Sequence, residues 1–139
     1  MTGGKMKRTI VILTVIILGL FITGCSSTHE KGLLQGNVLI GPITPVEQPG
    51  QEITLRCDVY ALRKIIIYYK SGEKLIQQVD IYCDEEEQIT RYRVELEPGT
   101  YIVDINHVGI DYSDDVPKQV EIKSGATPKL DIEIDTGIR

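Results

Sequence analysis

The segment 107–115 holds the densest group of side chains in this sequence that could bind a metal ion. Calcium takes six to eight oxygen ligands in proteins, so a loop rich in carboxylates is one way to build a calcium site. The spacing is not that of an EF-hand loop, however, and aliphatic residues interrupt it. We therefore favour a solvated loop that connects two strands, with the histidine at a strand end, and expect no metal site. The candidate ligands are His107, Asp111, Asp114 and Asp115.

The sequence contains no recognisable catalytic pattern. It has no Gly-x-Ser-x-Gly, no phosphate-binding loop and no dinucleotide fingerprint. His107 lacks an evident serine or cysteine partner, and His29 lies in a polar stretch that cannot hold catalytic geometry. We therefore expect a protein that is not an enzyme and that needs no cofactor.

The N-terminus has the three regions of a secretory signal. Three basic residues, Lys5, Lys7 and Arg8, precede the uncharged apolar segment 10–22, and small residues follow. Thirteen residues of helix span roughly 20 Å, which is short of the roughly 30 Å hydrocarbon core of a bilayer. The pattern predicts a helical signal peptide over residues 1–24 and a flexible tether over 25–32. The alternative is an uncleaved N-terminal anchor helix.

The last residues of this region, Ile-Thr-Gly-Cys at 22–25, resemble the lipobox of prokaryotic lipoproteins. That resemblance implies cleavage before Cys25, a diacylglyceryl group on its thiol and acylation of the new amino group. Two or three acyl chains anchor a protein durably, whereas one chain binds only marginally. The expected location is the cell membrane, with the protein lipid-anchored and facing outside the cytoplasm.

Cys57 and Cys83 remain once Cys25 carries the lipid, and two cysteines in an exported domain suggest one disulfide. If residues 71–72 form a hairpin turn, Cys83 lies across from Tyr60, and Cys57 comes within reach where the incoming loop bends back. The bond would stabilise the fold by roughly 3 kcal/mol. The alternatives are two free thiols or a bond to another chain. A zinc site would need two further ligands, and the sequence has no Cys-x-x-Cys.

The charge of the chain excludes one class of partner. The net charge is −5, and because residues 1–24 carry +3, the remaining residues carry −8. An acidic body disfavours nucleic acid, since phosphate binding needs a basic patch, and it also disfavours lying flat on anionic lipid. The four adjacent acids at 84–87 are typical of a solvated turn.

Alternation of apolar and polar residues predicts an all-β domain over residues 33–139. The clearest case is the stretch in which Tyr92, Val94 and Leu96 alternate with charged residues. Glycine and proline punctuate the sequence about every ten residues, and no stretch shows helical periodicity beyond two turns. The pattern favours a seven-stranded antiparallel sandwich. The expected strands are 33–40, 61–69, 74–82, 91–97, 101–106, 116–123 and 129–135.

The run 91–103 resembles the core of carboxypeptidase-regulatory-like domains, which are transthyretin-like (prealbumin-like) sandwiches. It reads Tyr-x-Val-x-Leu-x-Pro-Gly-x-Tyr-x-Val from Tyr92 to Val103. The stretches 41–46 and 130–139 are similar to those of small prokaryotic lipoproteins that carry one such domain. Hydrolases of purine catabolism with this fold end in Tyr-Arg-Gly-Ser, whereas this chain ends in Thr-Gly-Ile-Arg, so their activity is not carried over.

These observations together predict a membrane-anchored, non-catalytic binding or structural module. We expect the protein to contact the membrane through the lipid. We expect it to contact a protein or cell-envelope component through the loops 41–57 and 107–115, because functional residues on rigid scaffolds usually lie on loops. The alternative is a lipoprotein that binds a metal or a small ligand through its acidic loops.

Overall fold

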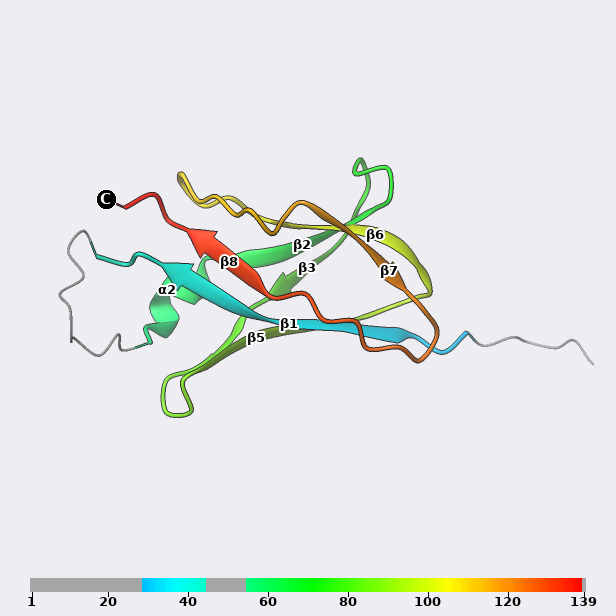
Figure 1. Ribbon diagram of the computed structural model, residues 1–139, viewed down its shortest axis with the longest axis horizontal. Helices are drawn as coiled ribbons and strands as arrows, with labels where there is room; N and C mark the ends of the chain where they lie inside the picture. The colour runs from blue at the N-terminus through cyan, green and yellow to red at the C-terminus, as the bar shows by residue number, and fades with distance from the viewer. Residues whose placement is uncertain (1–28, 45–54, 139) are drawn as a thin grey trace, which may run out of the picture.

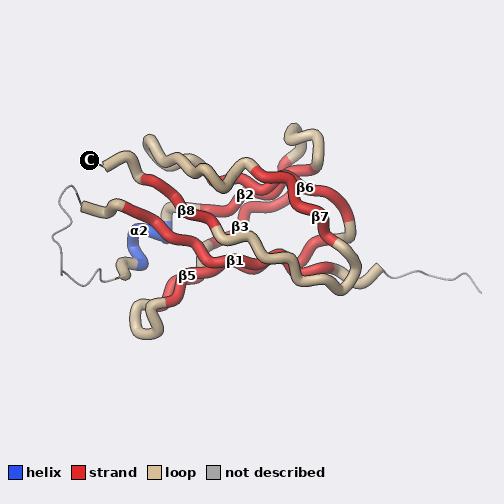
Figure 2. The backbone as a smooth tube through the Cα atoms, in the orientation of Figure 1, coloured by secondary structure: helices blue, strands red, loops and turns tan. Residues whose placement is uncertain are grey.

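Alternating apolar residues build two four-stranded β-sheets whose apolar faces pack against each other (Figures 1 and 2). This computed structural model describes residues 29–44 and 55–138. The first sheet has the order β4-β5-β1-β8 and the second has the order β3-β2-β6-β7. The elements are β1 (Gly32–Gly41), α2 (Cys57–Ala61), β2 (Lys64–Tyr69), β3 (Leu75–Asp80), β4 (Tyr82–Asp84), β5 (Ile89–Leu96), β6 (Gly99–Ile105), β7 (Lys118–Ile122) and β8 (Ile132–Asp135).

The expectation of two packed, mostly β layers is confirmed, but the count of seven strands and the wholly antiparallel pairing are wrong. The structure has eight strands in its described parts, and β1 pairs parallel with β8, with Val38 beside Ile132. The reason lies in the preceding connection. β7 ends beside the start of β6, and the chain crosses to the first sheet at that end, where the Leu33 amide donates to the Ala126 carbonyl. β8 must therefore run in the same direction as β1.

The strand predicted over 61–69 begins later, at Lys64, because the short helix α2 precedes it. Tyr60 turns inward from this helix and is only 2% exposed. Its hydroxyl accepts a hydrogen bond from the Ile40 amide at 3.3 Å. A helix of five residues is too short to show a 3.6-residue periodicity, so the sequence pattern did not reveal it.

The strand predicted over 74–82 is divided between the two sheets. β3 pairs with β2 in the second sheet, and β4 pairs with β5 in the first. The chain crosses between the sheets at Ile81, whose buried side chain joins the core. Ile81 continues the apolar–polar alternation of β3, so the sequence pattern showed no break there. The prediction therefore joined β3 and β4 into one strand.

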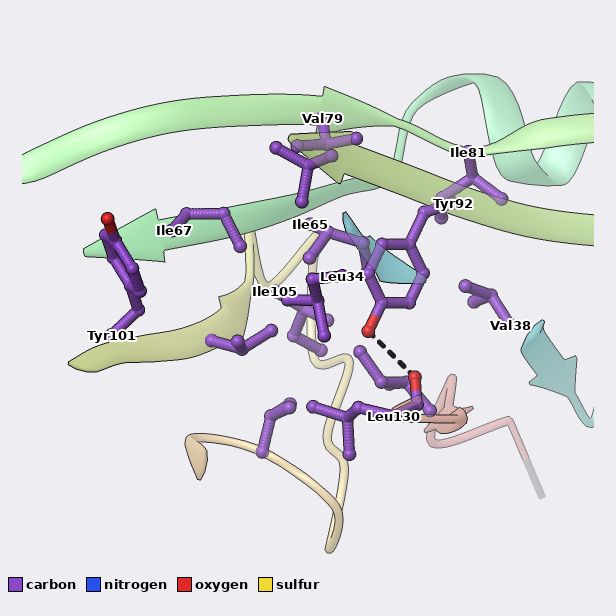
Figure 3. Packing of buried hydrophobic residues seen from close by; sticks show 14 of the residues in the cluster. Leu34, Val38, Ile65, Ile67, Val79, Ile81, Tyr92, Tyr101, Ile105 and Leu130 are labelled. Carbon is purple, nitrogen blue, oxygen red and sulfur yellow. Dashed lines mark hydrogen bonds between the residues drawn. The ribbon is translucent and has the colours of Figure 1, made fainter. Parts of the chain in front are cut away.

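The core lies between the sheets and contains residues from every strand except β4 (Figure 3). Tyr92, Val94 and Leu96 point into it from β5, as their alternation predicted. The fully buried Tyr92 satisfies its hydroxyl by donating to the Leu130 carbonyl at 2.7 Å. Burial raises the pKa of Tyr92 well above its usual value, so the hydroxyl remains a donor.

The proposed signal peptide and Cys25 lie outside the described residues, as do positions 45–54 of the first predicted loop. Among the residues that are described, no helix has both the length and the apolar character needed to cross a membrane.

Gly36 supplies a test of the β1–β8 packing. A Cβ atom at Gly36 would lie 1.8 Å from the Leu130 carbonyl oxygen, so Gly36→Ala must push the two backbones apart. We expect a loss of about 2 kcal/mol or more in the free energy of unfolding, measured by urea denaturation. Gly41→Ala, on the same strand with nothing within 4 Å of the added atom, is the control and leaves the midpoint nearly unchanged. Equal midpoints for the two variants would contradict this packing.

Candidate functional site

One end of the two-sheet body collects the segments that could carry a function. The chain enters β1 at Gly32, and β1 carries it to the opposite end, which we call the far end. Helix α2, the turn between β4 and β5, the loop after β6 and the C-terminal residues all lie there (Figure 1). Ten residues of strand span roughly 33 Å, so the far end is separated from the chain entry by the length of the molecule.

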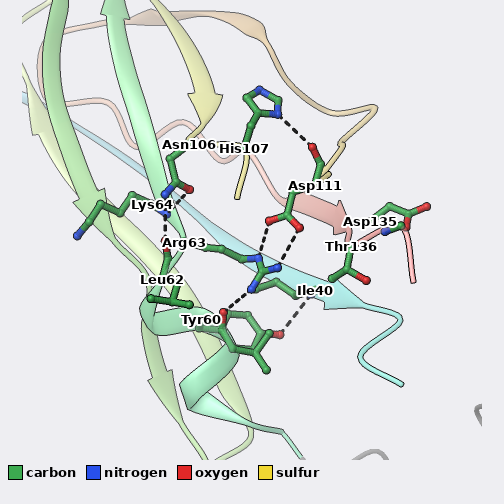
Figure 4. A network of polar contacts seen from close by, with 12 residues as sticks. Ile40, Tyr60, Leu62, Arg63, Lys64, Asn106, His107, Asp111, Asp135 and Thr136 are labelled. Carbon is green, nitrogen blue, oxygen red and sulfur yellow. Dashed lines mark hydrogen bonds and ion pairs between the residues drawn. The ribbon is translucent and has the colours of Figure 1, made fainter. Parts of the chain in front are cut away.

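A buried ion pair joins two of these segments (Figure 4). Arg63, between α2 and β2, holds the carboxylate of Asp111 with two hydrogen bonds, from Nε at 2.7 Å and from Nη2 at 2.9 Å. The side chains are 11% and 3% exposed, and Nη1 of Arg63 also donates to the Val59 carbonyl at 2.7 Å. Charge-assisted, two-point bonds of this kind are the strongest hydrogen bonds in proteins, so the pair fixes the loop after β6 to the helix.

The same loop is held at its start by Asn106 and His107. The Asn106 side chain accepts from the Lys64 amide at 3.0 Å and donates to the Leu62 carbonyl at 2.9 Å. His107 adopts a left-handed backbone with φ +43°. Its ring nitrogens face the Asp111 carbonyl and the Asp104 carboxylate, each at 3.2 Å. Among the described residues, neither ring nitrogen contacts a serine or cysteine side chain. Both nitrogens instead face groups of this loop and of β6, so His107 holds the loop in place.

The structure does not bring the four candidate metal ligands of the sequence analysis together. Both oxygens of Asp111 are taken by Arg63, and Asp114 accepts from the Tyr112 hydroxyl at 2.6 Å. Asp115 accepts from the Glu133 amide at 2.8 Å. Within the described residues, no three of the His, Cys, Asp and Glu side chains converge on one point. The sequence showed that acids were dense here but could not show that each has a separate partner.

The acidic residues at 84–87 form a turn, as expected, and Asp84 shapes it. One Asp84 oxygen accepts from the backbone amides of Glu86 and Glu87 at 2.9 and 3.0 Å. The hydrogen bond from the Glu87 amide is the main reason why the pKa of Asp84 lies below its usual value. Glu85 instead reaches α2 and accepts from the Cys57 amide at 3.0 Å. The turn therefore braces the helix.

A disulfide between Cys57 and Cys83 ties α2 to β4, with the Cα atoms 5.5 Å apart. The sequence left this pairing open against free thiols or a bond to another chain. In the structure, α2 brings Cys57 back toward the hairpin, which is the bend that the pairing requires. Together with the buried Tyr60, the bond holds the helix against both the first sheet and the core.

Three large apolar side chains are exposed around the buried ion pair. Leu62 adjoins Arg63 in the sequence, and Ile110 and Tyr112 flank Asp111. They are 66%, 73% and 58% exposed. Ile110 packs on Gly137 near the C-terminus. A Cβ atom added to Gly137 would be only 2.4 Å from the Cδ1 atom of Ile110. Sequence reasoning noted that aliphatic residues interrupt the acids of this loop but assigned them no function, because the sequence does not show which of them are exposed.

A hollow of about 240 Å³ lies away from these residues, along β4 and β5. Arg91 sits over the ring of Tyr82 there, 5.1 Å from the ring centre. Pockets for small molecules usually measure roughly 300–1,000 Å³, so this hollow is smaller than a typical small-molecule site. Its lining residues are Asp80, Tyr82, Arg91, Tyr92 and Arg93.

The ion pair is open to a direct test. Arg63→Met leaves the Asp111 carboxylate buried without its partner, which typically costs about 3–5 kcal/mol. Arg56→Met is the matched control, because the Arg56–Asp58 pair is exposed, with side chains 55% and 65% accessible, and such pairs contribute less than about 1 kcal/mol.

Chemical denaturation of both variants measures the difference. Adding Asp111→Leu to Arg63→Met should restore part of the lost stability, because the buried charge is then gone. A double variant no more stable than Arg63→Met, or a control equally affected, would contradict the assignment of a buried, mutually dependent pair.

Comparison with known proteins identified no relative: no family model matches the chain, and no curated protein matches it.

Proposed function

We propose that this protein is a membrane-anchored lipoprotein outside the cytoplasm and acts as a non-catalytic binding module. The observation that carries the proposal is the position of the far-end surface formed by Leu62, Ile110 and Tyr112. It lies at the opposite end of the body from the segment that leads back to Cys25. An anchor at one end and exposed apolar side chains at the other suit a domain that holds a partner away from the membrane.

The properties of this surface support binding to a protein or another cell-envelope component. Large apolar and aromatic side chains are enriched at the centres of protein interfaces, and charged residues are depleted there. The Arg63–Asp111 pair holds the loop beneath the surface in place, so binding loses little conformational entropy. The Asp114 carboxylate accepts from the Tyr112 hydroxyl beside these apolar side chains, which favours a partner that brings a basic residue to this position.

The disulfide supports the proposed compartment. Disulfides persist in secreted and periplasmic proteins and are rare in the cytoplasm. The bond lies at the base of the helix that positions Arg63, so an oxidising environment also keeps the far end assembled.

A transthyretin-like fold is part of the same proposal. β4 has three residues and lies at the edge of its sheet. Without it, seven strands in two sheets remain, which is the number that the resemblance implies. The Pro98-Gly99 step joins β5 in one sheet to β6 in the other, and the resemblance is carried by these two strands.

The anchor is tested by changing its cysteine. Cys25→Ser removes the thiol that takes the lipid, so we expect the protein to leave the membrane fraction. Intact mass spectrometry of the unaltered membrane-extracted protein should give the mass of an acylated chain beginning at residue 25. The Cys57→Ser/Cys83→Ser double variant is the control and should stay with the membrane. Unaltered protein that is soluble and retains Met1 would refute the anchor.

The binding surface is tested by photo-crosslinking in cells. A photoreactive amino acid at position 110 should give a discrete adduct, because Ile110 is the most exposed large apolar residue of the described chain. Adding Leu62→Asp should abolish that adduct by placing a charge in the apolar patch. The same probe at the exposed Gln78 on β3 is the control and should give none. An adduct at 78 but not at 110, or one insensitive to Leu62→Asp, would contradict the proposed surface.

A further inference from the structure

The turn between β2 and β3 combines exposed apolar side chains with basic ones. We call residues 69–75 the tether-end turn. It exposes Tyr69 and Leu75, which are 48% and 46% accessible, and it carries Lys70 and Lys74. Tyrosine and lysine next to an aliphatic side chain are typical of segments at a membrane–water interface, where the apolar parts insert and the ammonium groups stay near the lipid headgroups.

Backbone hydrogen bonds make this turn a rigid platform. The Tyr69 amide donates to the Lys74 carbonyl at 3.0 Å, and the Gly72 amide donates to the Tyr69 carbonyl at 2.7 Å. Gly72 has φ +73°, which a side chain would strain. The turn therefore presents its exposed residues in one arrangement.

The Tyr69 ring is also held in place from below and above. It stacks on the Tyr101 ring, with centroids 6.2 Å apart and planes at 22°. Tyr101 is 5% exposed, and its hydroxyl donates to the Glu97 carbonyl at 2.8 Å. The Lys74 ammonium lies 5.4 Å from the centre of the Tyr69 ring. An exposed ring that is already ordered loses little entropy when another surface covers it.

The turn lies at the end of the body that the proposed anchor must hold close to the bilayer. Tyr69 pairs with Tyr101 near the start of β6, beside the end of β7 and the entry to β1. Figure 1 shows the turn in the half of the molecule from which the N-terminal chain leaves. Gly32 is seven positions after Cys25, so this end lies within about 25 Å of the lipidated cysteine even when that chain is fully extended.

The longest run of acids lies at the opposite end of the body from this turn. The acidic turn at 84–87 and the carboxylates of Asp111, Asp114 and Asp115 all lie at the far end. Lys70 and Lys74 form no ion pair within the described residues, whereas Lys31 and Lys123 are each bridged to a glutamate. Anionic lipid attracts each unpaired lysine near its surface and repels carboxylates, so this turn, with two unpaired lysines and the single acid Glu73, is attracted to such a surface.

We propose that the tether-end turn contacts an anionic lipid bilayer, inserting Tyr69 and Leu75 at headgroup level between Lys70 and Lys74. This contact sets the orientation of the domain: the tether end faces the lipid and the far end points away. It rests on the proposed anchor, because a few apolar and basic side chains do not bind a bilayer durably without acyl chains.

The orientation is tested on the full, acylated chain in vesicles that contain phosphatidylglycerol and a headgroup-spin-labelled phosphatidylcholine. Glu73→Cys places a free thiol in the turn for a fluorescent label, since the Cys57 and Cys83 thiols are bonded and Cys25 is acylated. Glu86→Cys, in the far-end acidic turn, is the matched control. We expect the label at 73 to be quenched at least threefold more than the label at 86.

Lys70→Glu/Lys74→Glu should reduce quenching at 73 to the level at 86, while the protein still floats with the vesicles because its acyl chains remain. Tyr69→Ser should also reduce quenching at 73, and Tyr82→Ser, which removes a similarly exposed tyrosine from β4, should not. Protein that floats with equal quenching at 73 and 86 overturns the orientation but leaves the anchor intact. Protein that does not float refutes the anchor and the orientation together.

Discussion

The position of β1 between β5 and β8 is the constraint on which the rest of the structure depends. β1 pairs antiparallel with β5 and parallel with β8, so it determines at which end every connection of the first sheet must lie. The parallel pair requires the chain to cross between sheets at the tether end and to finish at the far end. Gly36 permits this, because the Leu130 backbone passes where any other residue would have a side chain.

The far end combines buried polar contacts with exposed apolar ones, which reverses the usual arrangement. Arg63 and Asp111 lie under the surface while Leu62 and Ile110 lie on it. A buried ion pair is weak evidence for stability, since an apolar pair of the same volume often serves as well. It does specify one loop conformation, because only the correct placement satisfies all the hydrogen bonds of the guanidinium. We therefore interpret the pair as a device that positions the loop.

Local patterns predicted the parts of this fold that depend on neighbouring residues. The alternation through Tyr92, Val94 and Leu96 identified β5 and its buried face, and Pro98-Gly99 identified the turn that follows. The sequence could not reveal contacts between distant residues. Arg63 and Asp111 are 48 positions apart, and no local signal relates them. The same limit applies to the candidate metal ligands at 107–115, because proximity in sequence grouped carboxylates that tertiary contacts hold apart.

Net charge is a property of the whole chain, whereas attraction to a surface depends on where each charge lies. An excess of eight negative charges after residue 24 argues against lying flat on anionic lipid, and that conclusion holds for a body whose charges are mixed. In the proposed orientation the acidic turn at 84–87 and the loop after β6 lie at the far end, so their repulsion by the lipid falls with the distance of that end from the bilayer. That distance is roughly the 33 Å length of β1, several times the Debye length of about 8 Å at physiological salt. The proposed upright orientation therefore keeps the acidic turn at 84–87 several Debye lengths from the membrane, whereas a flat orientation brings this turn close to the lipid.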